Sequence, residues 1–430
     1  MKQRLFLMPP ILAAFLALAA DWPQYRGPGG LGIALDKGLP VTWSADTNLA
    51  WQTKLPGPGS SCPIVVGNKI LLTCFSGYGL DLKNPGDMKN LKRHLVCLDR
   101  ARGKVLWTRE VAAVLPEARY DDQLLLHGYA TSTPASDGKN VYVFFGISGV
   151  LAFDLEGKQL WQTSVGKKTH GYGSAASPVL YKDLVIVNAN IESGALVALD
   201  KNTGKEMWRA ASLSDSWSTP LLVEIPKGGT ELVVSEAKKV LGFDPDTGKE
   251  LWHVNYNQHP WYGCASAVAH EGVVYAFAHN SVAIRAGGRG DITTTHTLWQ
   301  KGHHCLTSPV YHEDYLYFPD GPVAFCVKAD DGKEMYRERL VAKPNPDDKS
   351  DIDRPGDCYA SPLVADGKIY CVSRGKGNFV LEAGPKFKQL AHNTLDADAG
   401  VCNGNPAVSS GQLLLRSDRY LYCIGKKAKP

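Results

Sequence analysis

Histidine and cysteine side chains gather at two places in the sequence and could bind a metal ion. His259 stands shortly before Cys264, and His303, His304 and Cys305 are consecutive. Neutral imidazole and thiolate are the usual ligands of zinc and copper in proteins. We therefore predict a candidate zinc or copper site formed by His259, His303, His304 and Cys305.

A second group of polar and aromatic residues shares one sequence context, shortly before a Ser/Thr-Pro dipeptide or a variant of it. Aromatic rings and hydrogen-bonding side chains gathered in one place could hold a protein, peptide or saccharide ligand. The plainer interpretation of both groups of residues is a polar, water-lined funnel in which some of the cysteines form disulfides. The candidate ligand-binding residues are His127, Tyr129, His170, Tyr172, Asp215, Trp217, Trp261 and Asp357.

Bringing these residues together requires a repeating architecture, and the sequence contains one. In Leu196–Trp208 a strand pattern ends at Asp200, a turn follows at Gly204, and a second strand carries the tryptophan. Because glycine supplies the positive φ of the turn, each copy predicts a β-hairpin. The fixed place of the tryptophan predicts packing between neighbouring units. Further copies lie at residues 240–252, 96–107, 151–161 and 325–336.

The Ser/Thr-Pro dipeptides or their variants mark eight starts, near residues 61, 132, 176, 218, 265, 307, 360 and 404. Four short strands per unit, repeated at this spacing, predict an all-β, eight-bladed β-propeller with four antiparallel strands per blade. Residues 21–430 would form this single domain. The last unit lacks room for a fourth strand, so we expect the N-terminal strand that carries Trp51 to complete it and close the ring. If each start opens the innermost strand of a blade, the candidate residues meet at one mouth of the central channel.

These residues resemble the PQQ-repeat, or quinoprotein-like, β-propeller superfamily. Its repeat has the form Ala-x-Asp-x-x-Thr-Gly-x-x-x-Trp, and the segment from Ala198 to Trp208 fits it residue by residue. Blades 5 and 7 depart from the repeat, because Ala286–Gly290 and Gly384-Pro385 replace their hairpins. In size and blade number the chain is similar to the propeller subunit of the bacterial outer-membrane assembly machinery and to exported PQQ-like repeat proteins. That resemblance implies a non-catalytic binding or scaffold protein that acts through the channel mouth and its loops.

The same resemblance carries an alternative, a PQQ- and calcium-dependent quinoprotein oxidoreductase that acts on alcohols or sugars. In this alternative Trp217 or Trp261 would stack on the quinone, and Asp215, Asp357 or a histidine would act as the base. The well-known alcohol dehydrogenases of the superfamily carry adjacent cysteines, and the sequence has no such pair and no Cys-x-x-Cys-His haem motif. The binding or scaffold protein is therefore our leading hypothesis, with no catalytic residue assigned.

The ten cysteines allow disulfides if the protein is exported. Cys74 with Cys97, or Cys326 with Cys371, could pair, but connectivity cannot be read from sequence. Cys97, Cys326 and Cys423 occupy a repeat position that elsewhere holds alanine or glycine, so we expect these three to be buried.

The N-terminus and the charge balance predict where the protein works. In residues 1–20, Lys2 and Arg4 precede an apolar run that ends in small residues, as in a secretory signal peptide. We therefore expect a periplasmic or secreted monomer without a transmembrane anchor. The chain has 47 Lys+Arg against 43 Asp+Glu, and only its last residues gather lysines, which argues against nucleic acid as a partner.

Overall fold

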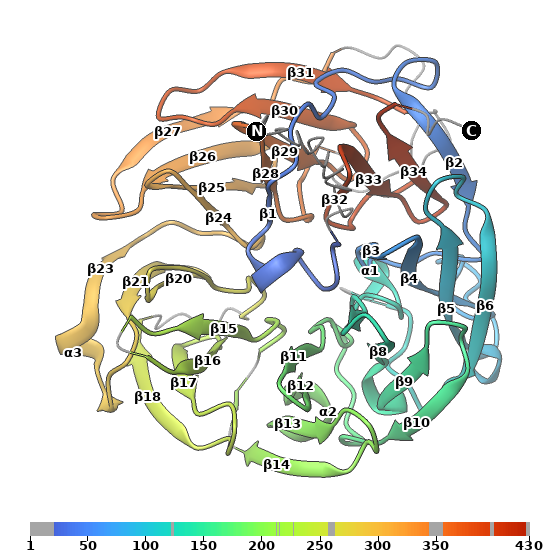
Figure 1. Ribbon diagram of the computed structural model, residues 1–430, viewed down its shortest axis with the longest axis horizontal. Coiled ribbons are helices and arrows are strands. Elements are labelled where there is room, and N and C mark those ends of the chain that lie inside the picture. Colours follow the sequence, from blue (N-terminus) through green and yellow to red (C-terminus); the bar gives the residue numbers. More distant parts are fainter. Residues whose placement is uncertain are drawn as a thin grey trace, which may run out of the picture.

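A computed structural model describes residues 21–121, 124–211, 213–214, 216–226, 228–256, 263–343, 356–395 and 400–426. The expected signal peptide, residues 1–20, lies outside the described residues. Eight β-sheets stand around a central axis like the blades of a propeller (Figure 1). Each blade has four antiparallel strands, and the short strands β1 and β22 add a parallel strand to two of them. The predicted eight-bladed, all-β fold is confirmed.

The first four blades follow one another along the chain. Blade 1 contains β3 (Ile64–Val66), β4 (Lys69–Ser76), β5 (Lys92–Asp99) and β6 (Val105–Ala112). Blade 2 contains β7 (Ala135–Ser136), β8 (Asn140–Phe144), β9 (Val150–Asp154) and β10 (Gln159–Thr163). Blade 3 contains β11 (Val179–Tyr181), β12 (Leu184–Ala189), β13 (Ala195–Asp200) and β14 (Glu206–Ala211). Blade 4 contains β15 (Leu221–Glu224), β16 (Thr230–Ser235), β17 (Lys239–Phe243) and β18 (Glu250–Asn255), with β22 (Gly290–Asp291) beside β18.

The second half repeats the plan, and the last blade borrows a strand from the N-terminus. Blade 5 contains β19 (Val268–His270), β20 (Val273–Phe277), β21 (Ser281–Arg285) and β23 (Thr297–Lys301). Blade 6 contains β24 (Val310–His312), β25 (Tyr315–Asp320), β26 (Val323–Lys328) and β27 (Glu334–Arg339). Blade 7 contains β28 (Leu363–Ala365), β29 (Lys368–Val372), β30 (Asn378–Glu382) and β31 (Gln389–Asn393), with β1 (Ile33–Ala34) beside β28. Blade 8 contains β32 (Ala407–Ser409), β33 (Gln412–Arg416), β34 (Tyr420–Ile424) and β2 (Leu49–Lys54).

The helices are all short and lie between strands. Three are single 3-10 turns and three are four-residue α-helices, and the first, η1, lies near the centre of the ring in Figure 1. They are η1 (Pro28–Gly30), η2 (Met88–Asn90), α1 (Leu124–His127), η3 (Gly146–Ser148), α2 (Asn190–Ser193) and α3 (Thr293–His296).

The ring closes through the N-terminal strand. β2 pairs antiparallel with β34, with Trp51 opposite Cys423. The half-buried indole of Trp51 donates to the carbonyl of Arg100 in blade 1 at 3.2 Å. The same strand therefore completes blade 8 and packs on blade 1, which confirms the predicted closure.

The repeated tryptophans join each blade to the next. The Trp208 indole donates to the carbonyl of Pro245 at 3.1 Å, and its ring covers the turn glycine of blade 4 so closely that a Cβ at Gly248 would lie 2.4 Å from it. Trp161 makes the same contact with Lys201 and Gly204. The predicted role of these tryptophans in packing between blades is confirmed.

Blade 5 departs from the repeat, as expected, and its neighbour adapts. Trp161 and Trp208 donate to a carbonyl in the hairpin of the next blade. The fully buried Trp252 instead donates to the Glu231 carboxylate at 2.6 Å. The same carboxylate accepts from the backbone N–H of Gly287 and from the Arg289 guanidinium, at 3.1 and 3.0 Å. Glu231 thus ties the irregular segment 286–290 to blade 4.

A closed ring of hydrogen bonds surrounds the channel where the first strands begin. At each start, the residue before the proline, or before Ala267 in blade 5, donates its backbone N–H to the side chain of the equivalent residue in the next blade. Seven acceptors are oxygen atoms at 2.7 to 3.0 Å, and the eighth is the sulfur of Cys62 at 3.2 Å. We call this ring the belt. In order it comprises Cys62, Thr133, Ser177, Thr219, Ser266, Ser308, Ser361 and Asn405, which donates back to Cys62.

The N-terminal segment crosses the centre of the ring, and we call residues 21–34 the strap. Figure 1 shows η1 and β1 on this path. Trp22 exchanges two backbone hydrogen bonds with Val65 in blade 1, at 3.0 and 2.9 Å. At the other end of the strap, Gly32 accepts from the N–H of Val364 in blade 7 at 2.9 Å. The strap therefore spans the channel between blades that are far apart in sequence.

All ten cysteines are free thiols. Cys97, Cys326 and Cys423 are buried in the core, as expected. Cys97 lies opposite Leu71 and Cys74 lies opposite His94, so these two thiols do not face each other across the sheet. The pairings considered for Cys74 with Cys97 and for Cys326 with Cys371 are not formed.

Candidate functional site

Two sets of loops emerge at the same end of the ring. Because the four strands of a blade alternate in direction, the loop before the first strand and the turn between the second and third strands lie at one end. We call this end the mouth. Nine of the twelve candidate residues lie in described loops before first strands, whereas Asp215, His259 and Trp261 lie outside the described residues.

His170, Tyr172 and Trp217 form an aromatic cluster at the mouth. Their ring centroids lie 5.1 Å (His170 to Trp217), 5.2 Å (His170 to Tyr172) and 5.5 Å (Tyr172 to Trp217) apart. The Trp217 side chain is buried, its indole donates to the carbonyl of Gly173, and its backbone N–H donates to Gly263, both at 2.8 Å. His170 and Tyr172 are half-buried. Hydrogen bonds to neighbouring loops therefore hold Trp217 in place, and the rings of His170 and Tyr172 that pack against it remain partly exposed.

His127 and Tyr129 have different surroundings. His127 ends α1, its Nδ1 lies 2.7 Å from the Thr131 hydroxyl, and burial lowers the pKa of its imidazole to about 4. A Cβ at Gly173 would lie 3.4 Å from this ring, so His127 borders the aromatic cluster. The Tyr129 ring is buried against Phe75, and its hydroxyl donates to the Ala118 carbonyl at 2.8 Å. Tyr129 therefore anchors the segment between β6 and α1, which is an insertion in blade 1.

The predicted metal ligands of blade 6 point to different partners. His303 Nε2 lies 2.9 Å from the carbonyl of Gly332, and His304 Nδ1 lies 3.1 Å from the Asp320 carboxylate. Cys305 is buried, its thiol donates to the Thr307 carbonyl at 2.9 Å, and burial raises its pKa to about 12. Within the described part of the chain, no three His, Cys, Asp or Glu side chains lie close enough to hold a metal ion.

Arg374 links three parts of the mouth. It is buried, its guanidinium lies over the Tyr359 ring at 5.1 Å, and Nη1 donates to Asn403 at 3.1 Å and to the carbonyl of Leu126 at 3.3 Å. Its backbone N–H donates to the carbonyl of Asp357 at 2.9 Å. Asp357 thus lies in a loop that this arginine joins to α1.

Sequence reasoning missed an acidic residue next to the aromatic cluster. Glu192 lies in α2, between the second and third strands of blade 3, and is 2% exposed. One carboxylate oxygen accepts from the Ser174 hydroxyl, and the other has no hydrogen-bond partner among the described residues. Burial raises its pKa to about 7. The feature of the sequence that could have identified Glu192 is its position in the turn between the second and third strands, which lies at the mouth.

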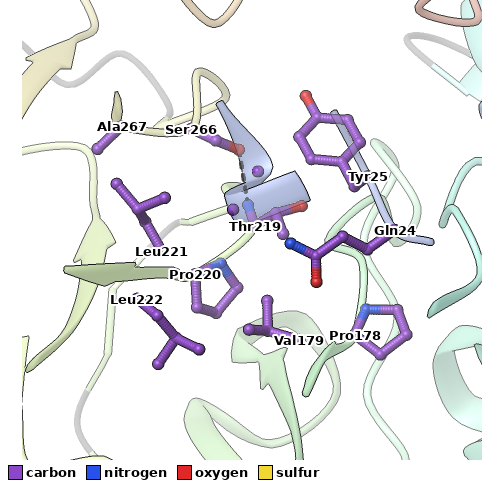
Figure 2. Close-up of a pocket in the computed structure, with 12 residues that line it drawn as sticks. Gln24, Tyr25, Pro178, Val179, Thr219, Pro220, Leu221, Leu222, Ser266 and Ala267 are labelled. Carbon is purple, nitrogen blue, oxygen red and sulfur yellow. Dashed lines mark hydrogen bonds between the residues drawn. The ribbon is translucent and has the colours of Figure 1, made fainter. Parts of the chain in front are cut away.

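A separate pocket opens between the strap and blades 3 to 5 (Figure 2). It contains ≈ 430 Å³ of empty space, including its opening to solvent. Most of its walls are apolar, and the amide of Gln24 and the phenol of Tyr25 are polar groups on the strap side. The lining residues are Gln24, Tyr25, Gly29, Gly30, Pro178, Val179, Thr219, Pro220, Leu221, Leu222, Ser266 and Ala267.

None of the helices in the described part of the chain has the length and apolar character needed to cross a bilayer.

Solved structures share this fold. BamB from Moraxella catarrhalis superimposes with a TM-score of 0.61 at 12% identity, over 89% of this chain and 98% of that one. A europium-containing methanol dehydrogenase gives a TM-score of 0.60 at 12% identity, over 95% of this chain and 98% of that one. The quinohemoprotein alcohol dehydrogenase from Comamonas testosteroni gives 0.57 at 12% identity, over 96% and 81%. At these identities the likeness shows the fold alone.

Sequence comparison gives the family. A curated relative, the tetrathionate hydrolase of Acidithiobacillus ferrooxidans, is 23% identical over 314 residues, which cover 65% of this chain and 58% of the relative. The profile of the PQQ-like repeat family, described as outer membrane protein assembly factor BamB, matches residues 29–189, 88–221 and 149–290. These overlapping matches span more than half of the chain and include blades 1 to 4, which carry four of the five repeated hairpins. The chain therefore belongs to the PQQ-like repeat family described by the outer membrane protein assembly factor BamB.

Proposed function

We propose that this protein is an exported, non-catalytic binding propeller that holds a polypeptide segment of a partner protein at its mouth. The observation that carries the proposal is the cluster of His170, Tyr172 and Trp217. Half-exposed rings on a rigid support are typical of surfaces that anchor a partner, because little side-chain freedom is lost on binding.

The contacts between a tryptophan and the hairpin of the next blade do not use this cluster. Trp161 and Trp208 join blades at the outer hairpins, whereas Trp217 lies in a loop at the mouth. The family description names an outer membrane protein assembly factor, BamB, and a BamB structure shares the fold, which fits a protein-binding rather than a catalytic function. A saccharide is the other ligand that such rings could hold.

A quinone cofactor fits the described residues poorly. Trp217 is the described tryptophan that could stack on a quinone, but its side chain is 6% exposed and lies against His170 and Tyr172. A planar cofactor needs an open ring face. We therefore derive no redox step, although the dehydrogenase structures share the fold.

Titration with defined ligands tests the proposal. The purified full chain is titrated with unfolded outer-membrane β-barrel polypeptides and, separately, with a panel of oligosaccharides. We expect saturable binding to the polypeptides and a loss of affinity of at least about tenfold in the double variant His170→Ala/Tyr172→Ala, as for truncated anchor residues.

The stacked pair His270 and Tyr311, with centroids 4.1 Å apart on the first strands of blades 5 and 6, offers a matched control. The double variant His270→Ala/Tyr311→Ala should bind like the wild type. If only the oligosaccharides bind, the ligand of the mouth is a saccharide and not a polypeptide. A saturable quinone spectrum after addition of PQQ and Ca²⁺, together with dye reduction by alcohols or sugars, would overturn the proposal.

A further inference from the structure

The strap carries a buried arginine that is only partly satisfied. Arg26 is 2% exposed. Its Nη2 donates to the carbonyls of Pro309 at 2.5 Å and Leu31 at 3.2 Å. Its Nε and Nη1 are buried and have no hydrogen-bond partner among the described residues. Three N–H groups on two nitrogen atoms of a cationic side chain therefore lack an acceptor, which is costly inside a protein.

Arg26 reaches the belt at blade 6, because Pro309, whose carbonyl it contacts, directly follows the belt residue Ser308. The described groups whose charge acts on it are Tyr25, Cys62 and Cys305, which belong to the strap, blade 1 and blade 6. None of these is a carboxylate, and burial lowers the pKa of the guanidinium only to about 10. Arg26 is therefore charged at neutral pH and has no neighbouring anion among the described residues.

Asn405, a residue of the belt itself, supplies a second unsatisfied donor. Its Oδ1 accepts from the Ser361 N–H at 2.7 Å, and its own N–H donates to the sulfur of Cys62 at 3.2 Å. Its Nδ2 is buried without a partner among the described residues. Asn405 is thus in contact with Cys62, and the charge of Arg26 acts on the same thiol. The unsatisfied atoms of both side chains are hydrogen-bond donors.

We propose that the interior of the channel binds one small monovalent anion, of the size of chloride or a carboxylate group, between Arg26 and Asn405 beside Cys62. The anion would accept from the unsatisfied N–H groups and balance a buried charge, and charge-assisted hydrogen bonds of this kind are strong. It would also fix the strap to the belt. The proposal goes beyond the function proposed for the mouth, because it uses none of the mouth residues.

Thermal unfolding of the purified full chain tests the site in solution. The melting temperature is measured in bromide, chloride and formate, with sodium gluconate holding the ionic strength constant, because gluconate is too large for a buried site. Above the dissociation constant, linkage predicts a rise of about 2 °C for each tenfold increase in a bound small anion for a chain of this size. A rise with chloride and bromide indicates a free inorganic ion, whereas a rise with formate alone indicates a carboxylate group.

Three variants distinguish loss of the anion site from a general loss of stability. Arg26→Gln should melt at the same temperature in all four salts. Asn405→Asp keeps the acceptor for Ser361 and adds a fixed carboxylate, so it should remain folded in gluconate and lose the response to small anions. Arg416 is an equally buried arginine, but its Nη1 and Nη2 donate to Ser61 and Cys74. Arg416→Gln should therefore be less stable and still respond to anions.

Crystals grown in sodium bromide give the direct test. The expected result is one anomalous peak within hydrogen-bond distance of Arg26 Nε or Nη1 and of Asn405 Nδ2. Water at this position, together with the same melting temperature for the wild type in all four salts, would overturn the proposal. These results do not depend on whether a polypeptide binds at the mouth.

Discussion

Glu192 and His127 stand near the same loop of the mouth, yet burial shifts their charges in opposite ways. Burial raises the pKa of Glu192 from 4.5 to about 7, because the buried carboxylate loses its hydration. Burial lowers the pKa of His127 from 6.5 to about 4 for the same reason, since its charged form is the protonated one. The mouth therefore contains an acid that releases its proton near neutral pH and a histidine that stays neutral.

These shifts predict a pH dependence of stability. Between about pH 4.5 and 7 the folded protein keeps the Glu192 proton that the unfolded chain has released, so this residue lowers the free energy of unfolding as pH rises. The contribution is about 3 kcal/mol over that interval. We expect Glu192→Gln to remove this decline, as measured by guanidinium unfolding from pH 4.5 to 8.

His127 makes the opposite contribution. Between pH 6.5 and about 4 the unfolded chain binds a proton that the folded protein does not, so stability falls as pH drops through this interval. The variant His127→Asn should therefore lose stability less steeply in acid than the wild type. For Glu192, the contradicting outcome is a free energy of unfolding that changes with pH in the same way in the wild type and in Glu192→Gln. That result would show that Glu192 is ionised normally in the folded protein.

Cys62 is the one sulfur acceptor among eight equivalent belt positions, and the others are hydroxyl or amide oxygens. We expect Cys62→Ser to unfold within about 1 kcal/mol of the wild type, because the hydroxyl can accept the same N–H. Cys62→Ala leaves the Asn405 N–H without an acceptor and should cost about 1–3 kcal/mol. Equal stability of the serine and alanine variants, measured by urea unfolding, would mean that the belt does not depend on this contact.

At the scale of the elements, the hairpin of one blade and the tryptophan of the previous blade form a unit. Trp208 buries its ring on Gly248, so Trp208→Ala should cost about 3–5 kcal/mol through the cavity that it leaves. The neighbouring Met207 on β14 is 55% exposed and supplies the control, since Met207→Ala should change stability by less than about 0.5 kcal/mol. Chemical unfolding of both variants measures the difference in stability. A cost below about 1 kcal/mol for Trp208→Ala would contradict the role of Trp208 in packing between blades.

At the scale of the whole molecule, the first residues of the domain both close the ring and cross it. Deletion of residues 21–55 removes the strap and β2, exposes the edge of β34, and should lower the melting temperature by roughly 10 °C or more and promote aggregation. Deletion of residues 21–44 removes the strap and keeps β2, so it should leave the protein less prone to aggregate. Light scattering during thermal unfolding distinguishes the two, and equal behaviour of the 21–55 deletion and the full chain would contradict closure by β2.

The sequence alone predicts the repeat, the blade number and the strand that closes the ring. These features depend on local patterns: a glycine that permits a positive φ in Leu196–Trp208, a tryptophan at a fixed distance from it, and a last unit that is one strand short. It also placed the candidate residues in one class of loop, because that assignment needs only the direction of the strands.

The tertiary structure decided what each side chain in those loops does. Tyr129 turned out to anchor an insertion, and the described members of the predicted metal site point to separate partners, because the direction of a loop side chain depends on contacts with other blades. The belt, the strap and the buried Arg26 depend on pairings between residues tens to hundreds of positions apart, such as Arg26 with Pro309. No local pattern encodes such a pairing, since it exists only once the ring has closed.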